Sequence, residues 1–202
     1  MLKLDERFRK KGVHVGRTPH MHTFFADFLC EGFSLSSYEI TRKNLMATQD
    51  IFNYIQVNET LSTGGQPTED QIRSAATEGF TTVINLATFQ PGESLEDEAG
   101  LVRSLGMAYY AIPVEWSSPQ HSDFAAFEQV MQMLPPGKTL LHCAANFRVT
   151  AFYSLYALKH LGWSQAQAEA FRVQIWEGSD YPVWEQFIGE LTGLISRQVG
   201  PE

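Results

Sequence analysis

Cys143 and Arg148 are the residues of this 202-residue chain whose types and spacing indicate chemistry. Cys143 ends a short apolar run, and Arg148 begins a segment with helical spacing of apolar residues, so the pattern predicts a strand, a tight loop and a helix. Backbone N–H groups at a helix N-terminus stabilise negative charge, and the same field lowers the pKa of a cysteine. The planar guanidinium of Arg148 adds donors suited to an oxyanion. The loop therefore predicts a thiolate nucleophile beside an anion-binding site.

An alternative interpretation makes Cys143 an inert core residue, the common fate of a free cysteine. It leaves Arg148 unexplained. Residues 46–202 contain only seven Lys or Arg, and the segment after Arg148 is apolar on most faces, which predicts a buried helix. A buried charge without a partner is costly, so an arginine at the start of such a helix indicates an anionic partner.

Charge is distributed unevenly along the chain. Residues 1–45 carry eight Lys or Arg against five Asp or Glu (+3), and residues 46–202 carry seven against eighteen (−11), which sum to −8. Because an acidic domain repels polyanions, we expect neither nucleic acid nor an anionic membrane as a partner. A phosphorylated or other small anionic substrate is the partner that we expect.

Cysteine and histidine usage gives two further expectations. The only two cysteines, Cys30 and Cys143, form no disulfide framework, which fits a reducing compartment. The six histidines are scattered and show no metal-ligand spacing, so we expect no metal and no cofactor. The start of the sequence lacks the shape of a signal peptide and no apolar run is long enough for a membrane helix, so the expected location is the cytoplasm.

Alternating strand and helix patterns begin at about Tyr54. We expect strands over residues 54–57, 81–87, 107–114 and 138–143, and helices over residues 68–79 (capped by Thr68), 94–106 (capped by Ser94), 121–134, 164–176 and 181–199, besides the one after Arg148. This alternation predicts an α/β fold with a central, mostly parallel sheet of four or five strands covered by helices on both faces. The Cys143 loop then lies at the carboxyl end of a strand, where such sheets bind ligands.

The first 45 residues lack this alternation and carry the basic excess. We therefore expect one domain over residues 46–202. Residues 1–45 are interpreted as an N-terminal extension, either a poorly packed arm or an upstream extension of the reading frame. The alternative is that Phe24, Phe25, Phe28 and Leu29 form a helix docked on the domain.

Four segments of the chain match motifs of a known family. They are Ser62–Thr68 (STGGQPT), Thr82–Leu86 (TVINL), Ile112–Val114 (IPV) and His142–Arg148 (HCAANFR). Over roughly residues 53–190 the chain resembles the bacterial DUF442 family, also called the beta-lactamase-hydrolase-like phosphatase domain family, within the cysteine-dependent protein tyrosine and dual-specificity phosphatase superfamily. The resemblance implies a cysteine-phosphatase-like fold and hydrolysis of a phosphomonoester, protein-borne or small, through a phosphocysteine.

The resemblance also implies roles for single residues. Cys143 would be the nucleophile, and Arg148 would bind the phosphate oxygens. Backbone N–H groups would complete this phosphate cradle. The cradle residues between Cys143 and Arg148 are Ala144, Ala145, Asn146 and Phe147. Asn146 stands where tyrosine phosphatases have glycine, and asparagine tolerates the left-handed conformation well.

A general acid would protonate the leaving oxygen, and in the family it comes from the loop after the preceding strand. Glu115 occupies that segment. Asp123 is the rival, although a carboxylate in the first turn of a helix has a structural reason to be there. For both acids the alternative is a solvated surface carboxylate.

The loop departs from the tyrosine phosphatase pattern in its length. Four residues separate Cys143 from Arg148 instead of five, and Val149 replaces the usual hydroxyl after the arginine, with Thr150 one step later. Four is the spacing of rhodanese-like sulfurtransferases, whose cysteine carries a persulfide. Three functions therefore stay open: a phosphatase, a sulfurtransferase carrying a persulfide on Cys143, and a non-catalytic anion-binding module.

Overall fold

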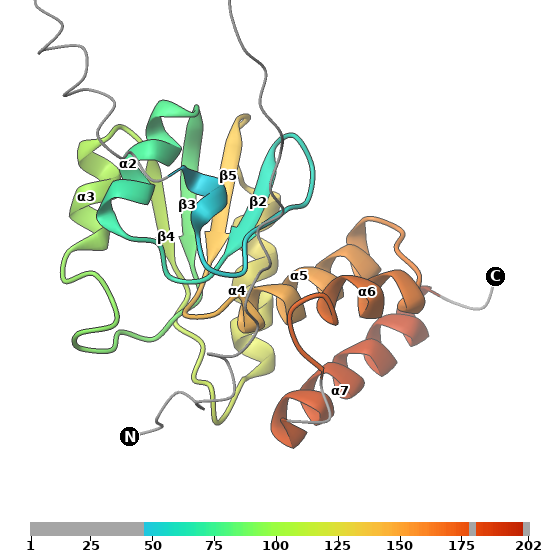
Figure 1. Ribbon diagram of the computed structural model, residues 1–202. Coiled ribbons are helices and arrows are strands. Elements are labelled where there is room, and N and C mark those ends of the chain that lie inside the picture. The colour runs from blue at the N-terminus through green and yellow to red at the C-terminus, as the bar shows by residue number, and fades with distance from the viewer. Residues whose placement is uncertain (1–46, 178–180, 200–202) are drawn as a thin grey trace, which may run out of the picture. The chain divides into compact units, whose positions relative to one another are not determined.

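The computed structural model describes residues 47–177 and 181–199, so the expected extension over residues 1–45 lies outside the described residues. Five strands form one sheet in the order β1-β2-β5-β3-β4 (Figure 1). Their bounds are β1 Ile55–Gln56, β2 Leu61–Gly64, β3 Phe80–Asn85, β4 Ala108–Ala111 and β5 Lys138–His142. Only β1 runs antiparallel to its neighbour. The mostly parallel sheet predicted from the sequence is confirmed.

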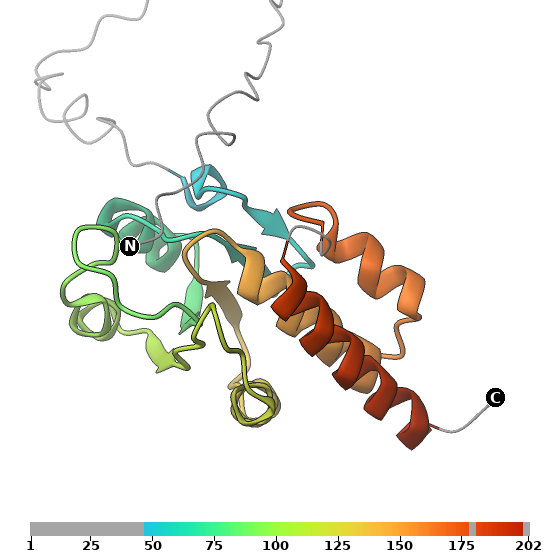
Figure 2. The same cartoon turned by 90° about the horizontal axis from the view of Figure 1, so that it is seen from below.

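Helices cover both faces of the sheet, as the two views show (Figures 1 and 2). On one side lie the short 3-10 helix η2 (Thr48–Asp50), α2 (Glu69–Thr77) and α3 (Glu98–Ser104). On the other side lie α4 (His121–Gln132), α5 (Phe147–His160), α6 (Gln165–Arg172) and α7 (Pro182–Val199). Within this second group α6 and α7 pack against α5. In the described residues no helix combines the length and apolar character needed to cross a membrane.

Each face of the sheet has its own hydrophobic cluster. Leu140 of β5 belongs to the cluster beneath α2 and α3. Leu141 and Cys143 belong to the cluster beneath α4 and α5. This follows from the alternation of side chains along a strand, and it places neighbouring residues of β5 on opposite faces.

The start of α2 follows its sequence closely. Thr68 caps the helix by accepting a hydrogen bond from Gln71 N at 3.2 Å, and Thr68 N donates to Gln71 Oε1 at 2.9 Å. These reciprocal bonds satisfy two backbone donors that a helix leaves unpaired. The predicted cap at Thr68 is confirmed, and the chain leaves the helix through Gly79, whose φ is +86°.

The predicted cap of the next helix is wrong by three residues. Ser94 Oγ accepts from Gln90 N at 3.0 Å and so closes a turn. Asp97 is the cap of α3, and its carboxylate accepts from Gly100 N at 2.8 Å. Ser and Asp are comparable N-caps, and here the turn at residues 90–94 uses the serine. As a consequence Glu98 becomes the first residue of α3.

Candidate active site

The loop after β5 joins the sheet to α5 at the carboxyl edge of the strands, as predicted. Cys143 N donates to Gly64 O at 3.3 Å, and Gln66 N donates to Ala144 O at 3.0 Å. A further bridge pairs Gly65 with Ala145. The segment after β2 therefore runs beside the cradle and fixes its first half.

Two glycines allow this close approach. A Cβ at Gly65 would lie 2.9 Å from Ala144 O, and a Cβ at Gly64 would lie 2.6 Å from Ile51 Cγ2. Both distances are shorter than real Cβ contacts, so the Ala144 backbone or the Ile51 side chain would have to shift. The Gly-Gly pair of the motif at residues 62–68 is thus required by the packing of this segment against the cradle and against Ile51.

Asn146 shapes the second half of the cradle. Its φ of 66° is left-handed, and its Nδ2 donates to Asn53 O at 2.6 Å and to Thr63 Oγ1 at 3.0 Å. Asn53 Nδ2 in turn donates to Ala145 O at 3.0 Å. The left-handed conformation expected for Asn146 is confirmed. Sequence reasoning missed Asn53, because a turn residue far away in the sequence gives no signal of this contact.

Cys143 is 0% exposed, whereas Ala144 is exposed and Ala145 is half-buried. The thiol therefore lies beneath the loop, whose solvent-facing part is formed by the two alanines. Complete burial also fits the inert-core interpretation of Cys143. The nucleophilic role of Cys143 thus depends on its reactivity and stays a prediction.

Arg148 is 8% exposed, and its Nε is buried with no hydrogen-bond partner among the described residues. The guanidinium carbon lies 5.4 Å from the centre of the Trp116 ring. In the described part of the chain no carboxylate forms an ion pair with Arg148. A buried cationic donor without an acceptor fits an oxyanion that binds from outside the chain.

Trp116, the ring that contacts this arginine, belongs to a cluster of aromatic side chains. The Trp116 ring centre lies 5.0–6.2 Å from those of Phe147, Trp176, Tyr181 and Trp184. Trp184 Nε1 also donates to Trp116 O at 2.8 Å, which ties the segment after β4 to α7. These contacts fix the segment that carries Glu115 close to the start of α5.

Thr150 is hydrogen-bonded to the backbone at the end of the loop. Its Oγ1 lies 2.9 Å from Asn146 O, to which it donates, and accepts from Trp176 Nε1 at 3.0 Å. Since a hydroxyl has one hydrogen, the bond to Asn146 O uses the Thr150 proton for the backbone of the cradle.

The two acids lie in different settings. Glu115 is exposed, and its Oε1 accepts from Ser117 Oγ at 3.2 Å. Asp123 Oδ2 accepts from Gln120 N at 2.9 Å at the start of α4. The structural reason expected for Asp123 is therefore present. The structure brings Cys143, residues 144–147 and Arg148 together in one loop, and it leaves Glu115 on the neighbouring surface segment.

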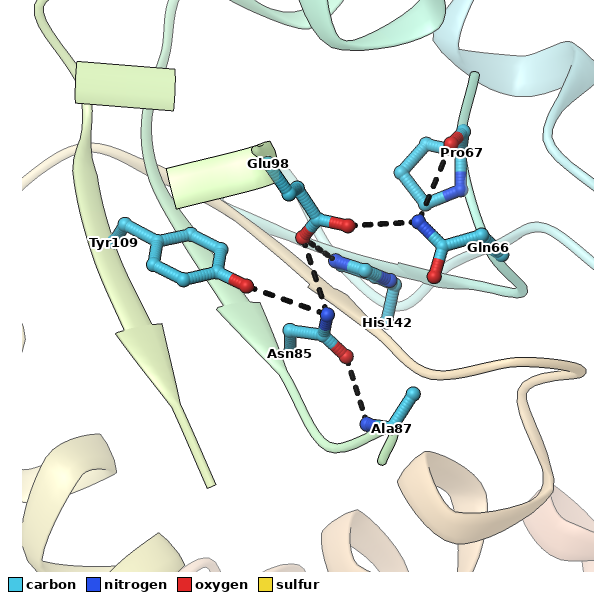
Figure 3. Close-up of polar contacts among 7 residues, drawn as sticks. All are labelled: Gln66, Pro67, Asn85, Ala87, Glu98, Tyr109 and His142. Carbon is cyan, nitrogen blue, oxygen red and sulfur yellow. Dashed lines mark hydrogen bonds and ion pairs between the residues drawn. The ribbon is translucent and has the colours of Figure 1, made fainter. Parts of the chain in front are cut away.

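A buried polar network lies behind the cradle (Figure 3). Glu98, 6% exposed, accepts from His142 Nε2 at 2.8 Å and from Gln66 Nε2 at 2.7 Å. Asn85 Nδ2 lies 3.2 Å from Glu98 Oε1 and 3.3 Å from the Tyr109 hydroxyl. Sequence reasoning missed Glu98, because it is one of four acids between positions 93 and 98 and nothing in the sequence distinguishes it.

The contacts within this network favour the ionised form of Glu98. Burial raises the pKa of Glu98, but the neighbouring His142 and the hydrogen bonds from His142, Gln66 and Tyr109 outweigh burial and hold that pKa below its ordinary value. Burial and the Glu98 carboxylate raise the pKa of Tyr109 to about 12. Glu98 is therefore a carboxylate at neutral pH, and Tyr109 keeps its proton.

Two cavities lie away from the Cys143 loop. One cavity of about 370 Å³ lies between α5, α6 and α7, and one of about 410 Å³ lies between the start of α4 and α7. Residues 143–148 line neither cavity, so the candidate site rests on the chemistry of the loop and not on cavity size. Within residues 47–177 and 181–199, no three His, Cys, Asp or Glu side chains gather where they could hold a metal ion.

Solved structures share this fold. A DUF442 protein from Shewanella putrefaciens CN-32, described as a candidate phosphatase, superposes with a TM-score of 0.66 at 32% identity and covers 73% of this chain and 96% of its own. TpbA from P. aeruginosa, solved in complex with phosphotyrosine, superposes with a TM-score of 0.56 at 14% identity and covers 71% and 90%. The second likeness shows the fold alone.

Curated relatives match a shorter stretch. The beta-lactamase hydrolase-like protein of Xylella fastidiosa (strain Temecula1) is 32% identical over 106 residues, which is 50% of this chain and 24% of that protein. The chain thus spans about a quarter of the length of the curated relatives it matches. No family model matches the chain. The identity to the Shewanella protein and the coverage of nearly all of it show that the chain belongs to the DUF442 family.

Proposed function

We propose that this protein is a cysteine-dependent phosphatase of the protein tyrosine or dual-specificity type, acting on a protein-borne or small phosphomonoester. The observation that carries the proposal is the buried Nε of Arg148 at the start of α5, which has no hydrogen-bond partner within residues 47–177 and 181–199 and follows Cys143 in the same loop. A phosphate there would accept from the guanidinium and from backbone N–H groups of residues 144–147. The relatives are bacterial, and the proposal includes a reducing bacterial cytoplasm, where Cys143 stays a free thiol.

The reaction has two steps. The Cys143 thiolate attacks phosphorus, the S–P bond forms, and the bond to the leaving oxygen breaks while Glu115 donates a proton to that oxygen. Water then attacks the phosphocysteine, the Glu115 carboxylate takes a proton from the water, and inorganic phosphate leaves with the thiolate restored. Glu115 is preferred to Asp123 because the Asp123 carboxylate already caps α4.

The test is release of p-nitrophenol from p-nitrophenyl phosphate. Wild type should turn over, Cys143→Ser should be inactive, and Glu115→Gln should lose about 10²-fold or more in kcat, in the range expected for a general acid. Asp123→Asn is the matched control and should keep most activity. Turnover that survives in Cys143→Ser would overturn the mechanism, and a larger loss in Asp123→Asn than in Glu115→Gln would reverse the assignment of the acid.

A sulfurtransferase is the second candidate, and two observations favour it. α5 begins at Phe147, so only residues 144–146 span the loop, and the Cys143 thiol is fully buried beneath them. A cradle this short suits a sulfane sulfur on the cysteine. Thiosulfate would transfer its outer sulfur to the thiolate, releasing sulfite, and cyanide would take that sulfur as thiocyanate. Thiocyanate production without phosphatase turnover would replace the first proposal with this one.

A further inference from the structure

We propose that Glu98 is a positioning residue, which holds the phosphate cradle from the α2 and α3 face of the sheet. This proposal rests on the phosphatase function above. Glu98 lies outside all four motif segments that resemble the family, yet three of them converge on its carboxylate, through Gln66, Asn85 and His142. Figure 3 shows the Glu98 carboxylate between Gln66 and His142, with Asn85 and Tyr109 beside it.

Glu98 is connected to both neighbours of Cys143. One carboxylate oxygen, Oε1, lies 2.8 Å from His142 Nε2, and His142 directly precedes Cys143. The other oxygen, Oε2, accepts from Gln66 Nε2 at 2.7 Å. The backbone N of Gln66 donates to the carbonyl of Ala144, which directly follows Cys143, at 3.0 Å. A single carboxylate therefore restrains the peptide on each side of the proposed nucleophile.

The position of Glu98 excludes direct contact with substrate. Leu140 packs on the α2 and α3 side of β5, while Leu141 and Cys143 pack on the α5 side. By the alternation of a strand the His142 imidazole projects toward α3, away from the Cys143 thiol. Glu98 thus acts through His142 and Gln66, which makes it a positioning residue and not a catalytic one.

The charge of Glu98 strengthens both connections. A hydrogen bond to an ionised acceptor is about twice as strong as one between neutral groups. The anion also holds the His142 proton on Nε2, and His142 Nδ1 is buried with no partner among the described residues. Removal of the charge should therefore make the peptides around Cys143 less rigid, although no residue of the cradle itself is replaced.

The variant Glu98→Gln, which is isosteric with the wild type, is expected to fold. It keeps an oxygen for His142 Nε2 and places an amide nitrogen opposite Gln66. The Gln66 Oε1 atom is buried and has no partner in the described part of the chain. A flip of the Gln66 amide would therefore give the new nitrogen an acceptor, so the variant loses the charge without leaving an extra unpaired group.

The experiment measures the dissociation constant of tungstate, a tetrahedral oxyanion, by calorimetry on the full chain. Glu98→Gln should bind tungstate about tenfold more weakly than wild type, at the low end of what loss of a supporting partner costs in metal sites. Glu96→Gln is the matched control, since Glu96 is an exposed acid two residues away, and it should bind like wild type. Partial unfolding would lower the number of sites and leave the dissociation constant of the folded molecules unchanged.

A charge swap gives a second readout. Gln66→Glu alone places two carboxylates against each other and should weaken tungstate binding. The double variant Gln66→Glu/Glu98→Gln restores one amide-to-carboxylate bond between these positions and should bind more tightly than Gln66→Glu. Additive effects of the two substitutions would contradict the coupling.

The outcomes separate the two proposals. Absence of tungstate binding in the wild type would overturn the proposed function and, with it, this role. Binding by the wild type that is equal in Glu98→Gln would overturn the role of Glu98 alone. Weaker binding in Glu98→Gln, normal binding in Glu96→Gln and rescue in the double variant are the expected result.

Discussion

Asn146 donates through its side-chain amide to the backbone carbonyl oxygen of Asn53, 2.6 Å away. This bond joins the first residue before α5 to a segment more than ninety positions earlier in the chain. The left-handed backbone of Asn146 and its side-chain bonds reinforce each other, because the conformation aims the amide at Asn53. The curvature of the cradle therefore depends on the segment before β1 as well as on the loop itself.

Replacement of Asn146 should separate these two contributions. Asn146→Gly keeps access to the left-handed conformation and loses the side-chain bonds, whereas Asn146→Ala also adds about 1–2 kcal/mol for that conformation. Both variants should be less stable than wild type, the alanine more so, since the Asn53 carbonyl loses this donor. Urea unfolding of the three proteins checks the order. Equal stability of Asn146→Gly and wild type would show that the bond to Asn53 contributes nothing.

Arg148→Lys tests the anion cradle. Lysine keeps the charge but has no planar fork and no Nε–H, so tungstate affinity should fall and kcat/KM should drop by roughly 10²-fold, as for loss of an oxyanion donor. Arg73→Lys is the matched control, because Arg73 is exposed on α2 and pairs across the helix surface with Glu69, at 3.6 Å. Wild-type activity in Arg148→Lys would contradict the assignment of Arg148 to the phosphate.

The Tyr109 hydroxyl should lose its proton at a higher pH than an ordinary tyrosine does. Burial and the Glu98 carboxylate raise the pKa of Tyr109 to about 12 from the ordinary 10.0, so the folded protein holds this proton more tightly than the unfolded chain. The stability that the protonated phenol contributes is fully present below pH 10 and is lost as the pH rises toward 12. The difference between the alkaline absorbance titrations of wild type and Tyr109→Phe measures the midpoint of the Tyr109 ionisation. In Glu98→Gln the midpoint should move down, and a wild-type midpoint near 10 would contradict the account.

Much of the fold follows from local patterns. The alternation of apolar strands and capped helices predicts four of the five strands, the buried helix after Arg148 and the cap at Thr68, because periodicity and capping are local properties. It misses β2, Leu61–Gly64, whose small and polar residues give no strand pattern and which joins the sheet by pairing with β5. The start of α3 is mispredicted because Ser94 and Asp97 are both good caps and only the turn at Gln90 decides between them. The loop that holds Cys143 and Arg148 is predicted for the same local reason.

The surroundings of the loop are not predictable in this way. Asn53 and Glu98 reach the cradle only through the tertiary packing of the segment before β1 and of α3. Gln66 lies in a motif that resembles the family, yet its two bonds become apparent only when α3 and the loop are placed beside it. Long-range contacts of single polar residues leave no periodic signal in a sequence.

The domain boundary stays a prediction. Residues 47–177 and 181–199 contain a five-stranded sheet covered on both faces. A chain that starts at Met46 should fold cooperatively and melt within roughly 3 °C of the full chain, which corresponds to about 1 kcal/mol for a domain of this size. Paired melting curves measure this. A larger drop, or aggregation, would mean that Phe24, Phe25 and Phe28 cover an apolar surface of the domain.

The most direct test of the account is the detection of a phosphate group on Cys143 itself. The wild-type protein is mixed with excess p-nitrophenyl phosphate, quenched within the first turnovers and analysed by peptide mass spectrometry. The account predicts a phosphorylated peptide that contains Cys143, enriched in Glu115→Gln if release of the leaving group outruns hydrolysis, and absent from Cys143→Ser. A protein that turns over the substrate while the peptide with Cys143 stays unmodified, and whose Cys143 also resists iodoacetamide in the folded state, would contradict it.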